Sequence, residues 1–522
     1  MKLLSSESTL SVLCVYLALC SSCTAARDTK EKPDSKAAAS SAKQQSAKPA
    51  AERQTPNQQT DLKDSSESPQ VVGKIGDYVI TKDELEKRLL AELRPDPYES
   101  NLHAEPMDAE TVLKKMIAEK AMVLEARKEG YLQREDVQES VERFKEKKLV
   151  RLLLGKYLQP RLTVTEAEIE EKLKSDPKLD RTRARALLQR TKASQLLDVY
   201  YKQLSEKFHV QKVSANFTKA ALIHERLLHH PKEPRKVGWI RNSQVKDELT
   251  PEEKNMPLAT FDGGQVTLQD WLKALCEIVP PRRPRDVHTP EGVERMLESA
   301  LRVPVLLAEV ELLGLDKTPS LVKEIREYED KRLLAAVQVG KYKEIEEPND
   351  QEIAAYFEKH KEAFAKPPRL KIDQIWCPDR KTVQQAKAAL DRGEGFETVK
   401  QQYSLQKEAK PFDTHPGSEG IFWQDLWGDP ASQEPKNDPN EIVGPIKGFY
   451  RDGIKWRIVK ILEKKPAELQ EYSDDIKERA KWQMVSEKRD AMLAQYGKEL
   501  LEKHSYQVYP DRIKDINPLD AR

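Results

Sequence analysis

The sequence predicts a mainly α-helical protein of two tandem helical modules, the second of which carries a small α+β insert. Three observations predict this fold class. Apolar residues recur at helical spacing through most of the chain, and two stretches about 185 residues apart resemble each other. The second copy also holds about 110 extra residues that include strand-like runs. At 522 residues the chain is too long for one hydrophobic core, which agrees with several domains.

The composition excludes some function classes. The chain has 89 basic and 88 acidic residues and a formal net charge of +1, so no overall field attracts nucleic acid. Cys276 and Cys377 have no metal-ligand spacing and are expected to be buried thiols. His224 and His229 are five residues apart and would point to different sides of a helix. We therefore predict no metal, no cofactor and no nucleic-acid partner.

The first 23 residues have the pattern of an export signal. Lys2 precedes an apolar run from Leu10 to Cys20, which is too short to span a membrane. The end of this segment resembles a bacterial lipoprotein signal, with Cys23 as the expected lipidation site. Two alternatives stay open, namely acylation of Cys20, and secretion without a lipid after cleavage near Ala25 or Ala26.

Residues 24–70 are predicted to form a disordered linker. The segment has no aromatic residue and Leu62 is its one large aliphatic residue. Such a segment buries too little apolar surface to offset the entropy lost on ordering. The linker is expected to hold a folded body away from a membrane.

An internal repeat defines the two modules. Residues 75–89 align with 261–275, and further matches follow at nearly constant spacing. The other aligned pairs are Gly130 with Gly314, 155–157 with 340–342, and 165–169 with 349–353. Four matches at one spacing indicate a duplication.

Each copy is expected to begin with a β-hairpin that leads into an amphipathic helix. Thr81 and Thr267 are predicted N-caps, with Glu84 and Asp270 at the position that completes a capping box. Gly130 and Gly314 are expected to end a later helix.

A last match locates the insert. Residues 199–211 resemble 495–507, so each module is expected to end in a similar helix, and the extra residues precede the second one. The predicted boundaries are module 1 at 71–230, module 2 at 231–366, the insert at 367–466, and the returning helix of module 2 at 467–522.

The sequence pattern of the insert indicates a strand, then helices and then further strands. This order predicts an α+β domain. Its strand-like runs are 370–377, 441–446 and 456–466, and its first helix is 382–392.

The order of motifs in the insert resembles the parvulin-type (PpiC-like) peptidyl-prolyl isomerases. Gly395, Phe396 and Ser404 match a helix motif of that family, and Gly444-Pro445 matches its Gly-Pro strand. Helices before the insert and one returning helix resemble the plan of SurA- and PrsA-type envelope chaperones. The resemblance implies that the modules are of the SurA-N/trigger-factor type and bind unfolded or exported polypeptides.

The chain departs from the family at the catalytic positions that the resemblance assigns. Gln374, Gln406 and Arg457 occupy the places of two histidines and a Cys or Asp. Glutamine still donates and accepts hydrogen bonds, so weak catalysis is one expectation. Arginine is larger than histidine and stays charged, so we expect Arg457 to pair across the pocket with Asp373 or Glu419.

Three aromatic residues of the insert, Phe422, Trp423 and Trp427, are expected to line a groove for apolar side chains of a peptide. The favoured function is an exported chaperone of the bacterial periplasm or cell envelope, anchored through lipid, with weak or lost isomerase activity. The alternatives are an active isomerase and a structural envelope lipoprotein.

Overall fold

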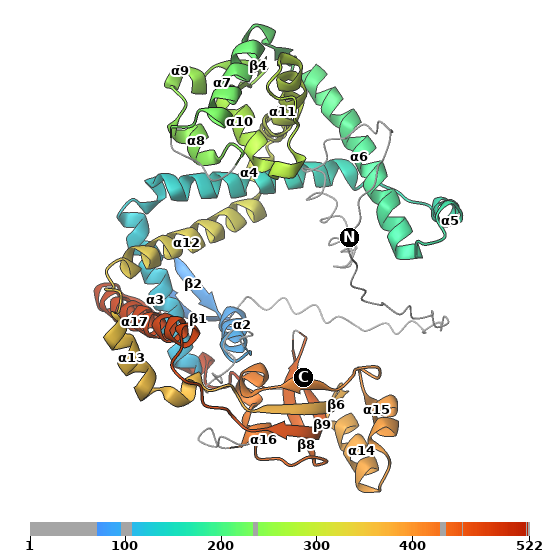
Figure 1. The fold of residues 1–522 in the computed structure, drawn as a ribbon, viewed down its shortest axis with the longest axis vertical. Helices are drawn as coiled ribbons and strands as arrows, with labels where there is room; N and C mark the ends of the chain where they lie inside the picture. The colour runs from blue at the N-terminus through green and yellow to red at the C-terminus, as the bar shows by residue number, and fades with distance from the viewer. Residues whose placement is uncertain are drawn as a thin grey trace. The chain divides into compact units, whose positions relative to one another are not determined.

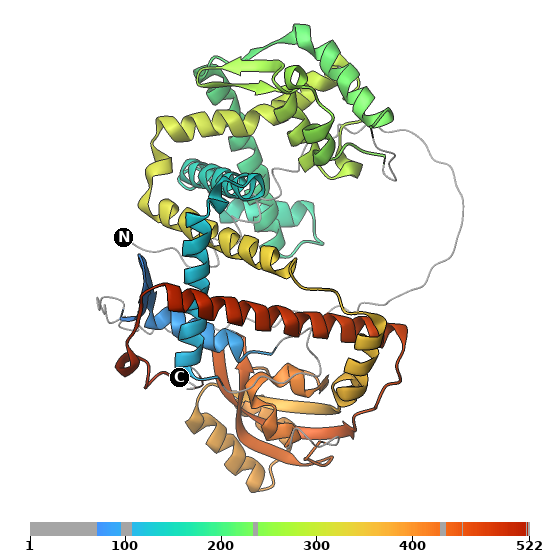
Figure 2. The ribbon, with the colours of Figure 1, turned by 90° about the vertical axis from the view of Figure 1, so that its left-hand side faces the viewer.

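The computed structural model describes residues 70–95, 107–232, 238–428, 435–451, 453–517 and 519. The expected signal, its candidate lipidation site Cys23 and the linker up to residue 69 lie outside these residues. The described chain forms two compact units, residues 138–329 and residues 70–137 with 330–519. Figures 1 and 2 trace the chain through both units.

The fold is mainly helical with small sheets, which confirms the predicted fold class. The elements that lie wholly or mostly in the unit 138–329 are α4 (Glu135–Leu158), α5 (Glu166–Ser175), α6 (Arg181–Lys207), β3 (Gln211–Lys212), α7 (Phe217–His229), α8 (Asn242–Asp247), α9 (Pro251–Lys254), β4 (Pro257–Phe261), β5 (Gly264–Thr267), α10 (Leu268–Glu277) and α11 (Pro290–Leu312). Helix α12 (Pro319–Tyr342) runs across the boundary between the units.

The second unit combines the described residues of 70–137 with those of 330–519. Its elements are β1 (Val71–Ile75), β2 (Tyr78–Thr81), α2 (Lys82–Glu92), α3 (Ala109–Lys128), α13 (Asp350–Lys359), β6 (Arg369–Cys377), α14 (Arg380–Asp391), α15 (Phe396–Tyr403), β7 (Phe412–Thr414), η6 (Pro416–Phe422), α16 (Gln424–Trp427), β8 (Ile442–Tyr450), β9 (Gly453–Lys465), α17 (Asp474–Lys503) and β10 (Tyr506–Val508).

The packing divides the chain differently from the predicted module boundaries, because each hairpin gains its third strand from the other copy. The hairpin β1–β2 pairs with β10, and the hairpin β4–β5 pairs with β3. Lys74 lies opposite Gln507, and the aligned residue Thr260 lies opposite Gln211. A two-stranded hairpin alone is marginally stable, so each hairpin depends on a strand distant in sequence. The predicted duplication stays a prediction.

Matched caps begin the helices of the two copies. Thr81 with Glu84 and Thr267 with Asp270 form capping boxes, as expected. Gly130 and Gly314 have left-handed backbone angles, with φ of 76° and 60°, which a glycine adopts at low cost. The sequence therefore predicts these local boundaries correctly.

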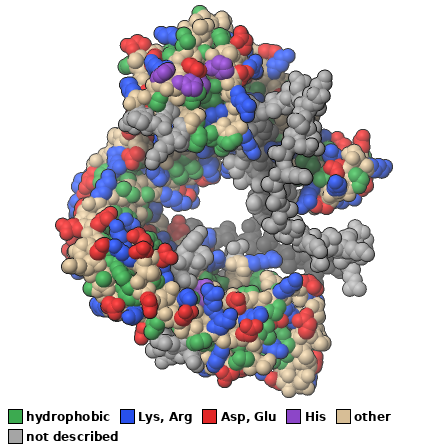
Figure 3. All heavy atoms as spheres, in the orientation of Figure 1, with side chains coloured by type: hydrophobic (Ala, Val, Ile, Leu, Met, Phe, Trp, Pro, Cys, Tyr) green, Lys and Arg blue, Asp and Glu red, His purple; other side chains and the backbone are tan. Residues whose placement is uncertain are grey.

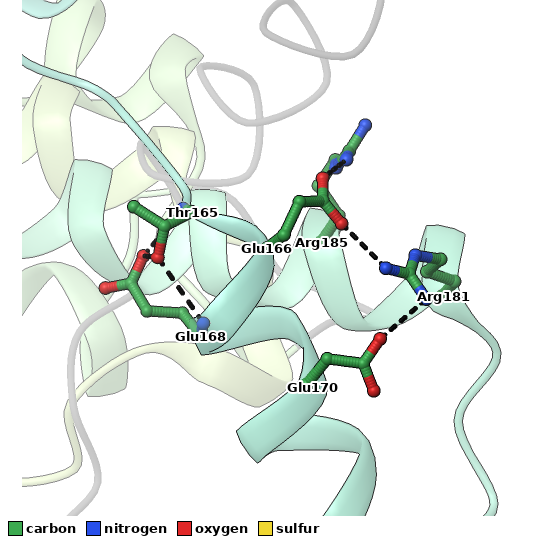
Figure 4. A network of polar contacts seen from close by, with 6 residues as sticks. All are labelled: Thr165, Glu166, Glu168, Glu170, Arg181 and Arg185. Atoms are coloured by element: carbon green, nitrogen blue, oxygen red, sulfur yellow. Dashed lines mark hydrogen bonds and ion pairs between the residues drawn. The ribbon is translucent and has the colours of Figure 1, made fainter.

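Exposed charges join the helical pair α5 and α6, as Figure 4 shows. Arg181 lies 2.8 Å from Glu166 and 2.7 Å from Glu170, and Arg185 also pairs with Glu166. Thr165 and Glu168 cap α5. Exposed ion pairs contribute about 0–1 kcal/mol each, so these contacts orient the two helices more than they stabilise them.

Buried carboxylates connect distant parts of the second unit. Asp330 of α12 accepts hydrogen bonds from Tyr78 at 2.7 Å and from Arg127 at 2.8 Å. Glu125 of α3 pairs with Lys503, and its other oxygen lies 3.2 Å from His504 Nε2. A buried carboxylate without partners is costly, so these pairs tie α12 to β2 and α3, and α17 to α3.

We expect replacement of Glu125 to remove part of the acid sensitivity of this unit. The hydrogen bond from Lys503 holds the pKa of Glu125 below its ordinary value of 4.5. The ionised carboxylate therefore adds stability above pH 4.5, and that stability is lost as the pH falls through the lower folded-state pKa. Glu125→Gln should lower the free energy of unfolding by about 1–3 kcal/mol at neutral pH, and by less in acid.

Denaturant unfolding of the full chain at a series of pH values tests this expectation. The exposed α4 carboxylate Glu139 provides the matched control, Glu139→Gln. Equal pH dependence in the two variants would contradict the account.

Candidate functional site

The strand pairing of the insert brings two of the predicted site residues together. Its sheet is antiparallel with strand order β7-β6-β9-β8. Trp376 lies opposite Arg457 in the register of β6 and β9. Because side chains alternate along a strand, Gln374, Trp376 and Arg457 share one face and Asp373 lies on the other. The first face packs against α16, and the second against α14 and α15.

Arg457 is the centre of a buried polar cluster on the first face. Its side chain is 3% exposed and forms an ion pair with Glu419 of η6, whose side chain is 8% exposed. Arg457 Nη1 donates to Gln374 Oε1 at 3.2 Å. Thr414 donates to the other Glu419 oxygen at 2.8 Å. The expectation that Arg457 pairs across the pocket is confirmed, with Glu419 as the partner.

Close packing holds the guanidinium group in place. The Arg457 Cζ atom lies 5.1 Å from the centre of the Trp376 ring, a cation–π distance. A Cβ atom on Gly448 would lie 2.7 Å from Trp376 Cη2 and 2.8 Å from Arg457 Nε. Only a glycine at 448 therefore leaves room for both side chains. Among the described residues Arg457 Nε has no hydrogen-bond partner.

A second buried ion pair lies on the opposite face of the sheet. Lys400 of α15 is 2% exposed and donates to Asp373 at 2.5 Å and to the Ala409 carbonyl oxygen at 2.6 Å. The same Asp373 oxygen accepts the backbone N–H of Gln374 at 2.8 Å. Asp373 thus contacts Lys400 and not Arg457, because strand alternation separates the two cations.

Gln406 stays apart from the cluster. The residue is partly exposed, and its backbone N–H donates to Ser404 Oγ at 3.1 Å. Ser404 Oγ also accepts the Trp376 N–H at 3.3 Å, so Ser404 links α15 to β6. In the described part of the chain, no hydrogen bond joins the Gln406 side chain to Gln374 or Arg457.

The three expected peptide-binding aromatic residues have different positions. Trp423 and Trp427 are each 3% exposed and pack in the core between α16 and the sheet, so they do not line an open groove as expected. Phe422 is partly exposed, and its ring centre lies 5.3 Å from that of Phe449. The apolar face of the sheet needs a cover, and the two indole rings provide it.

The end of α2 holds the segment that carries Glu419. The Ile421 N–H donates to the Leu93 carbonyl oxygen at 3.2 Å. Gly420 has a φ of 55°, and a Cβ atom there would lie 2.6 Å from the same oxygen. A glycine is therefore required for this contact, which fixes the backbone next to Glu419.

The contacts of Gln374 and Arg457 leave few polar groups available for prolyl isomerisation. Stabilising a twisted prolyl amide needs polar groups that face a bound proline, but Gln374 already accepts a hydrogen bond from Arg457, and Arg457 also pairs with Glu419. The nearby thiol of Cys377 is fully buried, and burial raises its pKa to about 12, so it stays protonated. Over the described residues, no group of His, Cys, Asp and Glu side chains is arranged to hold a metal ion.

Several residues of the site had no role in the sequence analysis. Lys400, Thr414, Gly448 and Gly420 position the cluster, but their partners are distant in sequence. The one usable signal was the glycine content of the two segments, because glycine often marks a close backbone approach.

Comparison with known proteins supports the assignment of the insert. No curated protein sequence matches the chain. One similar solved structure comes from work on PEB4 and Cj1289, two SurA-like chaperones of Campylobacter jejuni. It is 14% identical to this chain. The match covers 49% of this chain and 100% of that chain, with a TM-score of 0.24. PrsA from Bacillus cereus is 19% identical over 37% of this chain and 66% of its own, with a TM-score of 0.21. PrsA from Bacillus subtilis is 15% identical. The match covers 60% of this chain and 91% of the PrsA chain, with a TM-score of 0.15.

TM-scores this low do not support a transfer of function. The family of PPIC-type PPIase domains, in contrast, matches residues 348–478 directly. That range contains the four-stranded sheet, both buried ion pairs and the predicted catalytic positions. The parvulin-type resemblance of the insert is therefore confirmed, and the chain carries a PPIC-type PPIase domain at residues 348–478.

Proposed function

We propose that this protein is an exported folding factor that binds unfolded polypeptides, and that its PPIase domain has weak or no isomerase activity. One observation carries the proposal, namely the buried ion pair of Arg457 with Glu419 at a position where the family has a catalytic group. The pair and the hydrogen bond to Gln374 occupy the space and the donors that a prolyl substrate would use.

Client binding is supported by the helical parts of the chain. Long amphipathic helices outside the PPIase domain leave large apolar side chains exposed, as on surfaces that bind extended chains. Among the exposed residues are Leu222, Leu312, Leu313, Val322 and Trp482.

Export and lipid anchoring rest on the first 23 residues. Within the described residues, no helix is both long and apolar enough to cross a membrane. A lipid on Cys23 would supply the membrane attachment in this proposal, with residues 24–70 as a tether about 40 Å in root-mean-square length.

The second candidate function is an active isomerase, which the match of residues 348–478 favours. Binding and catalysis are separated by two measurements. In the first, the purified protein is added to a chemically denatured client and aggregation is followed by light scattering. We expect suppression near equimolar ratio, and a result no better than an equal mass of an unrelated helical protein would contradict the proposal.

The second measurement restores the family's side chains. We expect the double variant Gln374→His with Arg457→His to isomerise an X–Pro peptide faster than the wild type, because the change removes the guanidinium group and adds two imidazoles. A third variant adds Glu419→Gln to this pair of changes, because the carboxylate of Glu419 has no counter-charge once Arg457 is replaced. No gain in any of these variants, with the fold intact, would show that the ion pair is not what limits the activity.

Replacing one partner of the ion pair should loosen the sheet locally. Glu419→Gln leaves Arg457 buried without a counter-charge, which should lower the stability by about 3–5 kcal/mol. The double variant Arg457→Met with Glu419→Leu removes both charges and should leave the stability nearly unchanged. Hydrogen exchange of peptides from β6 and β9 measures the change in local opening. The exposed residue Glu408 provides the control variant Glu408→Gln. Equal protection in Glu419→Gln and the control would contradict this account.

The lipid anchor has a direct test. We expect Cys23→Ala to lose incorporation of radiolabelled palmitate and to move from the membrane fraction to the soluble fraction. Cys20→Ala is the control, and loss of label in that variant alone would move the anchor to Cys20.

A further inference from the structure

Helix α17 has a central stretch that no core covers. Its first turns pack on α13 through Ile476 and Ala480. Near its other end, Gly497 approaches Ala118 and Met122 of α3. Between these two contacts, no residue from 481 to 496 is buried. Figure 2 shows α17 as one long, straight helix.

A groove runs along this stretch, between α17 and the end of α12. It has a volume of about 290 Å³, and its apolar lining comes from Tyr342, Ile345, Trp482 and Val485. Trp482 is 60% exposed, which is unusual for an aromatic residue that lines a concavity. Exposed tryptophan residues beside a pocket are typical of binding surfaces.

The charges at the groove are unevenly paired. Lys481 lies 2.9 Å from Glu347, and the Arg489 guanidinium lies 4.8 Å from the centre of the Tyr342 ring. Glu346 and Glu478 also line the groove, and no ion pair engages either carboxylate among the described residues. Glu478 also attracts Lys481 electrostatically, and the Arg489 guanidinium keeps its charge over the Tyr342 ring. Three glutamates and two cationic side chains line the groove, so its net charge is −1. Figure 3 shows acidic, basic and hydrophobic side chains intermixed on this part of the molecule.

We propose that this groove binds an extended segment of an unfolded polypeptide in which a large apolar side chain is flanked by Lys or Arg. The inference rests on the proposed function and names its client chemistry. The apolar side chain packs on Trp482 and Val485, and the flanking cations approach Glu346 and Glu478. This surface is separate from the PPIase site, and none of its lining residues belongs to the Arg457 cluster.

The size of the groove favours an extended peptide over a second folded protein. Stable protein–protein interfaces bury about 800 Å² on each partner, whereas a concavity of 290 Å³ receives one or two side chains. An extended chain offers single side chains without a rigid surface around them, so it fits such a groove.

The test uses the full chain and three fluorescein-labelled Gly/Ser peptides that carry Lys-Phe-Lys, Glu-Phe-Glu or Lys-Ser-Lys at their centres. Binding is measured by fluorescence anisotropy at low and high salt. We expect the Lys-Phe-Lys peptide to bind most tightly, and Trp482→Ala to weaken it by about tenfold, as for an aromatic hot spot. Glu346→Lys with Glu478→Lys should reverse the preference between the two charged Phe peptides.

Matched controls keep the test specific. Trp239→Ala replaces another exposed tryptophan, and Glu171→Lys with Glu206→Lys reverses two exposed carboxylates elsewhere. None of these should change peptide binding. The inference would be overturned if Trp239→Ala and Trp482→Ala weakened peptide binding equally. It would also be overturned if the wild type bound the three peptides with equal affinity.

Two outcomes separate this inference from the proposed function. If the wild type suppresses client aggregation and Trp482→Ala does so equally well, the groove is not the client site but the chaperone function stands. If the wild type neither suppresses aggregation nor binds any peptide, the proposed function fails. Sedimentation of the full chain gives the last check, because dimerisation that Trp482→Ala abolishes would assign the groove to a second copy instead.

Discussion

The buried ion pair between Arg457 and Glu419 joins β9 to η6 inside the PPIase domain. A guanidinium group inside a sheet domain needs a counter-charge, because an unpaired buried charge costs several kcal/mol. Glu419 supplies it. Gly420 lets the end of α2 hold the backbone next to Glu419, and Gly448 leaves the volume that Arg457 occupies. The ion pair therefore links β9 to η6, β8 and the end of α2, and it lies in a packed core.

Strand pairing joins the two segments of the unit that contains the PPIase domain. Hairpin β1–β2 is completed by β10, which follows the PPIase domain in the chain, and α17 packs on α3. The N-terminal hairpin and the C-terminal helix therefore belong to one unit, and the PPIase domain lies between them in sequence. The groove along α17 belongs to the same unit and shares no residue with the Arg457 cluster.

Local signals in the sequence predict the structure correctly. Capping boxes at Thr81 and Thr267 and the strand predicted at 370–377 appear as expected, because caps and periodicity depend on neighbouring residues. Pairing between distant segments was not visible, so the exchange of strands between the copies and the burial of Lys400 against Asp373 were missed. Trp423 and Trp427 were placed in a groove because sequence alone does not tell whether an aromatic residue covers a sheet or faces solvent.

The central claim is that the PPIase domain is present but its site is closed. Exchange NMR of an X–Pro peptide with the wild-type protein tests it most directly, because the method observes cis/trans interconversion without a coupled enzyme. The uncatalysed reaction takes about 10–100 s at 25 °C. The account predicts an acceleration of less than about tenfold, equivalent to about 1.4 kcal/mol of barrier lowering. An acceleration of about a thousandfold that Gln374→Ala abolishes would contradict it and establish a glutamine-based isomerase.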